Sequence, residues 1–152
     1  MVKTLGTLLV AVLAAPAQPS AKPDFSGEWK MNLAKSNFGA LPPPEFITRN
    51  VTHAEPSLTI VEEQRPALGD EKVTRKYVTD GSETTFESAG TAVRTSAAWK
   101  ENTLLVVSSV DQVGLTFNDQ MSLSADGNTL TSAIRISSPQ GDADLTIVFD
   151  RQ

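Results

Sequence analysis

Cysteine is absent from this 152-residue chain, and histidine occurs once. The lack of cysteine excludes disulfides, thiol nucleophiles and lipid attachment through an N-terminal cysteine. The single imidazole, His53, makes a poor metal site, because such sites draw several ligands from histidine and cysteine. We therefore predict neither a metal nor another cofactor, and we expect His53 to be a half-exposed residue beside a turn.

Basic residues are also scarce, since 13 Lys and Arg stand against 18 Asp and Glu and give a formal net charge of -5. Nucleic acids and anionic membranes are bound through an excess of Lys and Arg, so neither is an expected partner. The sequence contains no Gly-x-Ser-x-Gly motif, no phosphate-binding loop and no zinc helix. We therefore assign no catalytic residues and expect a protein that is not an enzyme.

The first residues have the layout of a secretory signal. Residues 1–3 give a positively charged start, 5–15 form an apolar run, and Ala15-Pro16-Ala17 matches an A-x-A cleavage site. The apolar run is too short to anchor the chain across a bilayer. The predicted divisions are a signal peptide at 1–17, a flexible leader at 18–24 and a single domain at 25–152. We expect a periplasmic or secreted protein.

From residue 25 onward, helix signals are nearly absent, and short runs rich in Val, Ile, Thr and Phe alternate with turn residues. The turns recur about every 10 to 13 residues, which is typical of an antiparallel meander. Closure of such a sheet removes its exposed edges. We predict an all-β fold, an up-and-down antiparallel meander closed into a barrel of about 8–10 strands. The expected strands are 25–32, 46–53, 58–64, 71–79, 82–89, 92–100, 103–110, 115–125, 128–138 and 143–151.

Turns at 80–81, 101–102 and 126–127 set the register of three hairpins and fall at one end of the barrel, the base. The connection at 32–45, which includes three consecutive prolines, falls at the other end, the mouth. A one-residue slip would expose the predominantly apolar inner set. The predicted inward pairs are Arg75–Phe86, Tyr77–Thr84, Trp99–Leu104, Ala97–Val106, Asp119–Ile134 and Phe117–Ile136. The outward faces carry charged and amide side chains instead of an apolar band, so we expect no membrane insertion.

Four charged residues point into the lumen in this register: Arg49, Glu62, Arg75 and Asp119. Buried charges are retained where they are paired or used. One interpretation is an internal salt-bridge network that fixes the register. The other is that Arg75 with Tyr77, or Arg49, binds an anionic ligand group through forked hydrogen bonds. The candidate ligand-binding residues of the lumen are Arg49, Glu62, Arg75, Tyr77, Phe86, Phe117, Asp119 and Ile136.

The first strand opens with Phe25-Ser26-Gly27-Glu28-Trp29, and Arg151 falls on the inner face of the last strand at the base. This arrangement resembles the Gly-x-Trp signature of the lipocalin, fatty-acid-binding-protein and avidin group of calycins. It is also similar to small exported lipocalin-like proteins of bacteria. The resemblance implies that Gly27, Trp29 and Arg151 close the base, with the basic residue packed across the indole. The chain departs from fatty-acid-binding proteins in lacking a helical lid pattern at 32–45.

Three functions remain open from the sequence. The first is an exported carrier for a small, largely apolar molecule, with an anionic lipophile as one option. The second is a closed-core module that binds a protein partner, for which Leu105 and Val107 offer an outward apolar stripe. The third is a calycin-type enzyme that uses Glu62, Asp119 or Tyr77 as acid or base. A cavity would favour the first over the second, and a strongly raised carboxyl pKa inside it would favour the third.

Overall fold

The computed structural model describes residues 15–16, 21–66 and 69–152. The predicted signal peptide at 1–17 falls almost entirely outside these residues, and the predicted leader at 18–24 does so at 18–20, so both stay predictions. Within the described part of the chain, no helix is long and apolar enough to cross a membrane.

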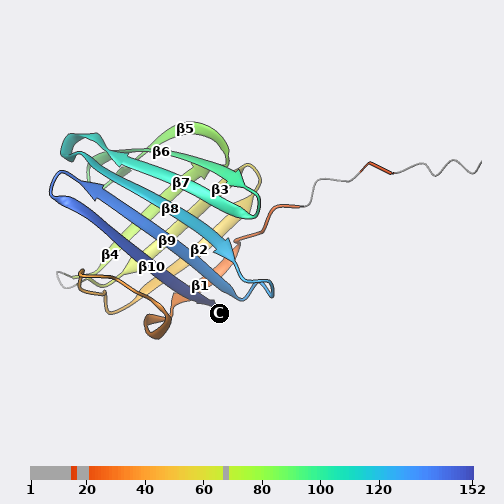
Figure 1. The fold of residues 1–152 in the computed structure, drawn as a ribbon, viewed down its shortest axis with the longest axis horizontal. Helices are drawn as coiled ribbons and strands as arrows, with labels where there is room; N and C mark the ends of the chain where they lie inside the picture. Colours follow the sequence, from red (N-terminus) through yellow and green to blue (C-terminus); the bar gives the residue numbers. More distant parts are fainter. Residues whose placement is uncertain (1–14, 17–20, 67–68) are drawn as a thin grey trace, which may run out of the picture.

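The described residues form ten strands in a single antiparallel sheet that curls into a barrel (Figure 1). This confirms the predicted all-β meander. Two single-turn 3-10 helices, η1 (Leu33–Lys35) and η2 (Asp111–Val113), interrupt the connections. The strands are β1 (Gly27–Met31), β2 (Ile47–Ala54), β3 (Ser57–Gln64), β4 (Glu71–Val78), β5 (Asp80–Ser88), β6 (Thr91–Lys100), β7 (Thr103–Val110), β8 (Leu115–Leu123), β9 (Thr129–Ser138) and β10 (Gly141–Arg151).

The barrel closes between its first and last strands, because β1 pairs with both β2 and β10. The order around the sheet is β4-β3-β2-β1-β10-β9-β8-β7-β6-β5, so β4 and β5 are the two ends of the sheet. In Figure 1 the base, with the β6–β7 and β8–β9 turns, lies at the right, and the mouth lies at the left.

The predicted hairpin across Asp80-Gly81 is wrong. Within the described residues no ladder joins β4 to β5, so Arg75 does not pair with Phe86, nor Tyr77 with Thr84. The hairpin does not form because residues 79 and 80 make hydrogen bonds elsewhere. The Thr79 N–H donates to the Pro56 carbonyl at 2.8 Å, which keeps the end of β4 beside β3. The next residue, Asp80, already pairs with Ala98 on β6, and the two strands separate.

The other predicted pairs are confirmed. Trp99 lies opposite Leu104, and Ala97 lies opposite Val106. Across the β8–β9 hairpin, Asp119 pairs with Ile134 and Phe117 pairs with Ile136. Both hairpins keep the period-two alternation that places one face of each strand in the lumen. A four-residue turn at Glu55-Pro56 would place Arg49 directly opposite Glu62, and the ladder between β2 and β3 contains this pair.

A tightly packed layer fills the base of the barrel. Its fully buried large side chains are Phe25, Trp29, Leu58, Leu104, Met121, Leu130 and Phe149. Arg151 covers this layer, since its guanidinium carbon lies 4.2 Å from the centroid of the Trp29 ring. The same guanidinium donates to the carbonyls of Ser26 at 2.7 Å and Gly127 at 2.9 Å. Gly27 makes room for it, because a Cβ there would approach Arg151 Nη1 to 2.5 Å.

His53 is more enclosed than the sequence suggested. Its side chain is 3% exposed, whereas a half-exposed turn residue was expected. The ring stacks on Phe25 at 5.6 Å and on Trp99 at 6.1 Å between centroids. Its Nδ1 accepts the Phe25 N–H at 3.2 Å, and its Nε2 lies 2.8 Å from Glu55 Oε1. The approach of the chain before β1 therefore covers the imidazole, which local sequence could not show.

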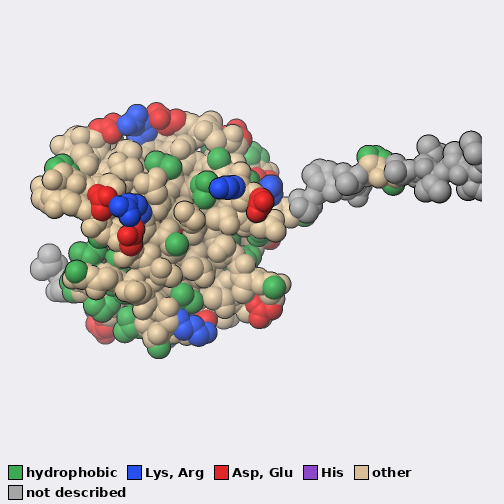
Figure 2. Space-filling view, viewed as in Figure 1, with side chains coloured by type: hydrophobic (Ala, Val, Ile, Leu, Met, Phe, Trp, Pro, Cys, Tyr) green, Lys and Arg blue, Asp and Glu red, His purple; other side chains and the backbone are tan. Residues whose placement is uncertain are grey.

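The long β1–β2 connection is hydrogen-bonded to β10. Asn37 and Thr146 exchange backbone hydrogen bonds at 2.7 and 2.8 Å, and Asn32 N donates to Val148 O at 2.8 Å. Its only described helical element is the three-residue η1. Figure 2 shows hydrophobic side chains gathered over this connection, beside the mouth, whereas the strands facing the viewer carry scattered charges of both signs. The mouth is therefore bordered by loops and not by a helical lid.

Candidate functional site

The barrel contains a cavity of about 710 Å³ that reaches from its middle to the mouth loops. Volumes of a few hundred to about 1,000 Å³ are typical of small-molecule sites. Most of the lining side chains are apolar, and Phe38, Leu41 and Pro66 supply part of the rim. The four charged lining residues, Arg49, Glu62, Arg75 and Asp119, come from the inner faces of β2, β3, β4 and β8.

All eight lumen residues predicted from the sequence line this cavity. They come from β2, β3, β4, β5, β8 and β9, and the alternation of each strand turns them inward. The set is Arg49, Glu62, Arg75, Tyr77, Phe86, Phe117, Asp119 and Ile136. Their role in binding stays a prediction. The rim residues Phe38, Leu41 and Pro66 were not predicted, because no strand periodicity assigns a facing direction to loop residues.

Glu62 lies between two arginines. Its Oε2 is 2.7 Å from Arg49 Nε, and its Oε1 is 3.1 Å from Arg75 Nη1. Burial acts to raise the pKa of Glu62, but the two guanidinium groups outweigh burial and hold that pKa below its ordinary value. Glu62 is therefore a carboxylate at neutral pH, bound by one arginine at each oxygen. This is the internal salt-bridge network that formed one of the two sequence interpretations.

The two arginines differ in what else they contact. Arg49 has a side chain only 7% exposed, donates to Ser132 Oγ at 3.0 Å, and stacks its guanidinium 4.2 Å from the centroid of Phe149. The Arg75 side chain is 27% exposed, and Glu62 is its ionic partner within the described residues. A guanidinium carries five N–H donors, so Arg75 keeps donors for another acceptor in the lumen.

Asp119 is the second carboxyl group of this cluster and is poorly satisfied. Its Oδ2 accepts from Ser132 Oγ at 3.3 Å, while its Oδ1 is buried and has no hydrogen-bond partner within the described residues. Burial is the main cause that raises the pKa of Asp119, to about 6. Ser132 therefore links Arg49 to Asp119. Nothing in the sequence pattern marked Ser132 as this link.

Tyr77 and Phe86 face each other across the open seam between β4 and β5. Their ring centroids are 6.4 Å apart, and the rings meet edge to face at 86°. Burial, the largest cause, raises the pKa of Tyr77 to about 12, so the phenol keeps its proton at neutral pH. The hydroxyl is thus a hydrogen-bond donor and acceptor at the lumen and a weak general base.

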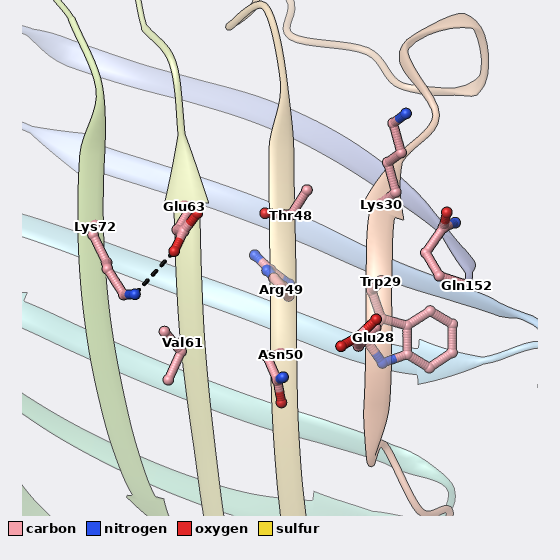
Figure 3. Close-up of a pocket in the computed structure, with 10 residues that line it drawn as sticks. All are labelled: Glu28, Trp29, Lys30, Thr48, Arg49, Asn50, Val61, Glu63, Lys72 and Gln152. Atoms are coloured by element: carbon pink, nitrogen blue, oxygen red, sulfur yellow. Dashed lines mark ion pairs between the residues drawn. The ribbon is translucent and has the colours of Figure 1, made fainter.

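A second hollow, of about 450 Å³, lies on the outer face of β1–β4 (Figure 3). Its floor is made by Thr48, Asn50 and Val61, and charged side chains border it. Glu63 and Lys72 pair there at 2.9 Å, and both are more than half exposed. Figure 3 shows Arg49 and Trp29 behind the strands, directed away from this face. Of the four charged residues of the lumen, Arg49 alone is also among the residues that line the outer hollow.

Metal binding has no support from the described residues. Across 15–16, 21–66 and 69–152, no group of three or more His, Asp or Glu side chains could hold an ion. The two acidic side chains of the lumen are separated by the arginine network, so the cluster suits an anion better than a cation.

No protein-family model and no curated protein matches the sequence. Solved structures do match. Zebrafish ileal bile acid-binding protein complexed with cholic acid is 16% identical, with a TM-score of 0.63 over 84% of this chain and 98% of that chain. A secretory abundant heat soluble protein from Ramazzottius varieornatus is 13% identical, with a TM-score of 0.66 over 88% and 98%. Echinococcus granulosus fatty-acid-binding protein 1 is 11% identical, with a TM-score of 0.58 over 84% and 96%. The chain therefore has the calycin-like β-barrel fold that these binding proteins share.

Proposed function

We propose that the protein binds a small, largely apolar molecule with an anionic group inside its barrel. The observation that carries this proposal is the mainly apolar cavity of about 710 Å³, open toward the mouth loops, with one partly exposed guanidinium, Arg75, in its wall. The apolar body would lie against Phe117 and Ile136, and the anion would take the remaining donors of Arg75. Removal of apolar surface from water supplies about 25 cal/mol per Å².

The similar structures support this choice of ligand class. The zebrafish protein is complexed with cholic acid, which combines a carboxylate with a rigid apolar body, and the Echinococcus protein is named for fatty acids. At these identities the likeness establishes the fold, so the ligand class comes to this chain only as a proposal. The chemistry of the lumen points to it independently, through Arg75 and the apolar lining.

A matched pair of fluorescent probes tests the proposal. 1-Anilinonaphthalene-8-sulfonate is permanently anionic, and N-phenyl-1-naphthylamine has the same ring system without the sulfonate. We expect both to bind, the sulfonate more tightly. Arg75→Ala should weaken sulfonate binding about tenfold or more, because a charge-assisted hydrogen bond contributes about 1.5–3 kcal/mol. Arg75→Ala should leave binding of the neutral probe nearly unchanged.

Lys72→Ala is the control, because Lys72 lies on the same strand and points outward. Equal losses for both probes in Arg75→Ala would refute the assignment of the anion to Arg75. No binding of either probe would refute the carrier proposal. Independently of the probes, native mass spectrometry of protein from its own host, with a denatured control, would identify any natural ligand by mass.

The two alternative functions are less well supported. A protein-binding module was expected to have a filled barrel, whereas the structure has a cavity. An enzyme would need an acid or base in the lumen. Glu62 is held as a carboxylate between arginines, and the pKa of Tyr77 rises to about 12. Asp119 is the one carboxyl group of the lumen with a raised pKa. Its hydrogen-bond partner within the described residues is Ser132 Oγ at 3.3 Å, and that hydroxyl is also held by Arg49.

Export is a further part of the proposal. We infer from residues 1–17 that the chain is secreted or moved to a periplasm, as in the bacterial lipocalin-like proteins that it resembles. Expression in a bacterial host followed by fractionation tests this. We expect the full chain in the periplasm with a mature N-terminus at Gln18, and a chain lacking 1–17 in the cytoplasm. An uncleaved full chain in the cytoplasm would refute export.

A further inference from the structure

The charge of the lumen depends on a single proton. Arg49 and Arg75 carry two positive charges, and Glu62 carries one negative charge, since its pKa is held low by both arginines. When Asp119 is ionised, these four side chains sum to zero. When Asp119 is protonated, they sum to one positive charge, which matches a ligand with one negative charge.

The two carboxyl groups respond differently to an added anion. Glu62 has a guanidinium at each oxygen, at 2.7 and 3.1 Å, so its ionised form is strongly favoured. Asp119 has only the Ser132 hydroxyl at 3.3 Å, and its Oδ1 has no partner within the described residues. A third negative charge in the lumen therefore disfavours the ionised form of Asp119 before it affects Glu62.

The groups around Asp119 place it close to this transition. Its ladder neighbours on β7 and β9, Val106 and Ile134, are apolar. Burial raises the pKa of the Asp119 carboxyl to about 6, and Glu62 acts in the same direction, while Arg49 and Arg75 oppose them. The polar and titratable groups that face it are Ser132 on β9, Arg49 on β2, Glu62 on β3, and Arg75 and Tyr77 on β4. Tyr77 stays neutral in the physiological range.

We propose that the lumen takes up a monoanionic amphiphile together with one proton, which binds to the Asp119 carboxylate. The inference rests on the proposed function and narrows its ligand class. A neutral amphiphile adds no charge and binds without this proton. A dianion leaves one negative charge unmatched. The free energy of anion binding and the protonation of Asp119 are therefore linked.

The two naphthalene probes separate this linkage from other effects of pH, because neither titrates between pH 5 and 8. We expect the dissociation constant of the sulfonate to rise about tenfold between pH 5 and pH 8, which corresponds to a one-unit rise of the Asp119 pKa on binding. The neutral probe should change less than about twofold. Its behaviour also controls for any effect of pH on the fold.

Asp119→Asn provides the decisive variant. Asparagine keeps the shape of the side chain and an oxygen that accepts from Ser132, and it fixes the uncharged state. We expect this variant to bind the sulfonate at pH 8 about as tightly as the native protein does at pH 5, with a flat pH profile. Circular dichroism and neutral-probe binding verify that the variant is folded.

Calorimetry in two buffers of different ionisation enthalpy counts the protons directly. At pH 6.5 we expect about half a proton taken up per sulfonate bound, and none in Asp119→Asn or with the neutral probe. Binding of both probes with no proton uptake by the native protein, or uptake that persists in Asp119→Asn, would overturn the inference and leave the carrier function standing. If neither probe binds at any pH, both the inference and the carrier function are overturned.

Discussion

The rings of Tyr77 and Phe86 meet edge to face across strands that share no ladder, with centroids 6.4 Å apart. Side-chain contact therefore takes the place of backbone hydrogen bonds at the seam between β4 and β5. Edge-to-face aromatic pairs contribute about 0.5–1.5 kcal/mol beyond their buried area. A seam held in this way should open more readily than the hydrogen-bonded wall elsewhere.

Phe86→Ala tests whether this pair limits exchange through the seam. We expect both the association and the dissociation rate of the neutral probe to rise several-fold in stopped-flow fluorescence. Loss of a contact to the probe would raise the dissociation rate alone. The control is Thr85→Ala, an exposed neighbour on β5. An unchanged association rate would show that the probe enters elsewhere.

Glu62→Gln should destabilise the fold strongly. The substitution removes the charge between Arg49 and Arg75. It leaves the buried guanidinium of Arg49 and the partly exposed guanidinium of Arg75 without their counter-ion. Breaking a buried pair in this way costs about 3–5 kcal/mol in free energy of unfolding. Urea unfolding at pH 7 measures it. Glu63→Gln, which disturbs an exposed pair with Lys72, should cost less than about 1 kcal/mol. Equal costs would contradict a buried network that stabilises the barrel.

Asp119→Asn should increase stability at neutral pH. The pKa of Asp119 is raised from an unfolded value near 3.8 to about 6, so the folded state binds the proton more tightly. The stabilisation from this proton is complete below pH 3.8 and is lost as the pH rises through 6. At pH 7 the native protein has therefore lost as much as about 3 kcal/mol of free energy of unfolding, and Asp119→Asn retains it.

Urea unfolding of both proteins at pH 7 and pH 4 measures this difference. The gain of Asp119→Asn should be present at pH 7 and should shrink markedly at pH 4. A variant that is less stable than the native protein at pH 7 would show that the Asp119 carboxylate is stabilised by contacts other than those described.

Gly27→Ala should disturb the base of the barrel. The backbone φ of Gly27 is +131°, and an added Cβ would meet Arg151 Nη1 at 2.5 Å. Arg151 would have to leave the Trp29 ring and its two carbonyl acceptors. Gly90→Ala isolates the backbone cost, because Gly90 also has a positive φ, +76°, and an added Cβ there would meet no atom within 4 Å.

We expect a loss of about 1–2 kcal/mol for Gly90→Ala and a clearly larger loss for Gly27→Ala in urea unfolding. In the Gly27→Ala background, Arg151→Ala should cost less than it does in the native protein, since the contact is already broken. Equal costs of Arg151→Ala in both backgrounds would contradict the proposed contact between residues 27 and 151.

Alternation and short turns were enough to predict most of the barrel. The β6–β7 and β8–β9 hairpins follow from period-two patterns on both sides of a tight turn, so Trp99–Leu104 and Phe117–Ile136 could be paired from the sequence alone. Asp80-Gly81 has the same kind of turn sequence, but the hairpin predicted there does not form. Instead, residue 79 bonds to Pro56 and residue 80 pairs with Ala98, and both partners lie far from the turn in the sequence.

The candidate site was predictable in part. Inward periodicity identified Arg49, Glu62, Arg75 and Asp119, because charged residues on an apolar face stand out in a sequence. The ion pairs that the carboxyl groups form with the arginines depend on the side-chain conformations across the lumen. The sequence alone could not predict these conformations. The unpartnered Oδ1 of Asp119 is likewise a result of packing, visible only once the neighbouring strands are in place.

The polar contacts of the lumen form one continuous chain from wall to wall. Arg75 on β4 contacts Glu62, Glu62 contacts Arg49, Arg49 contacts Ser132, and Ser132 contacts Asp119 on β8. Such a chain of contacts holds the opposite walls of the barrel at a fixed distance, because the walls cannot approach without breaking it. The barrel therefore keeps its width without a guest, and water can solvate its charges. We therefore expect a guest to enter by displacing water from a volume that already exists, without the opening of a collapsed core.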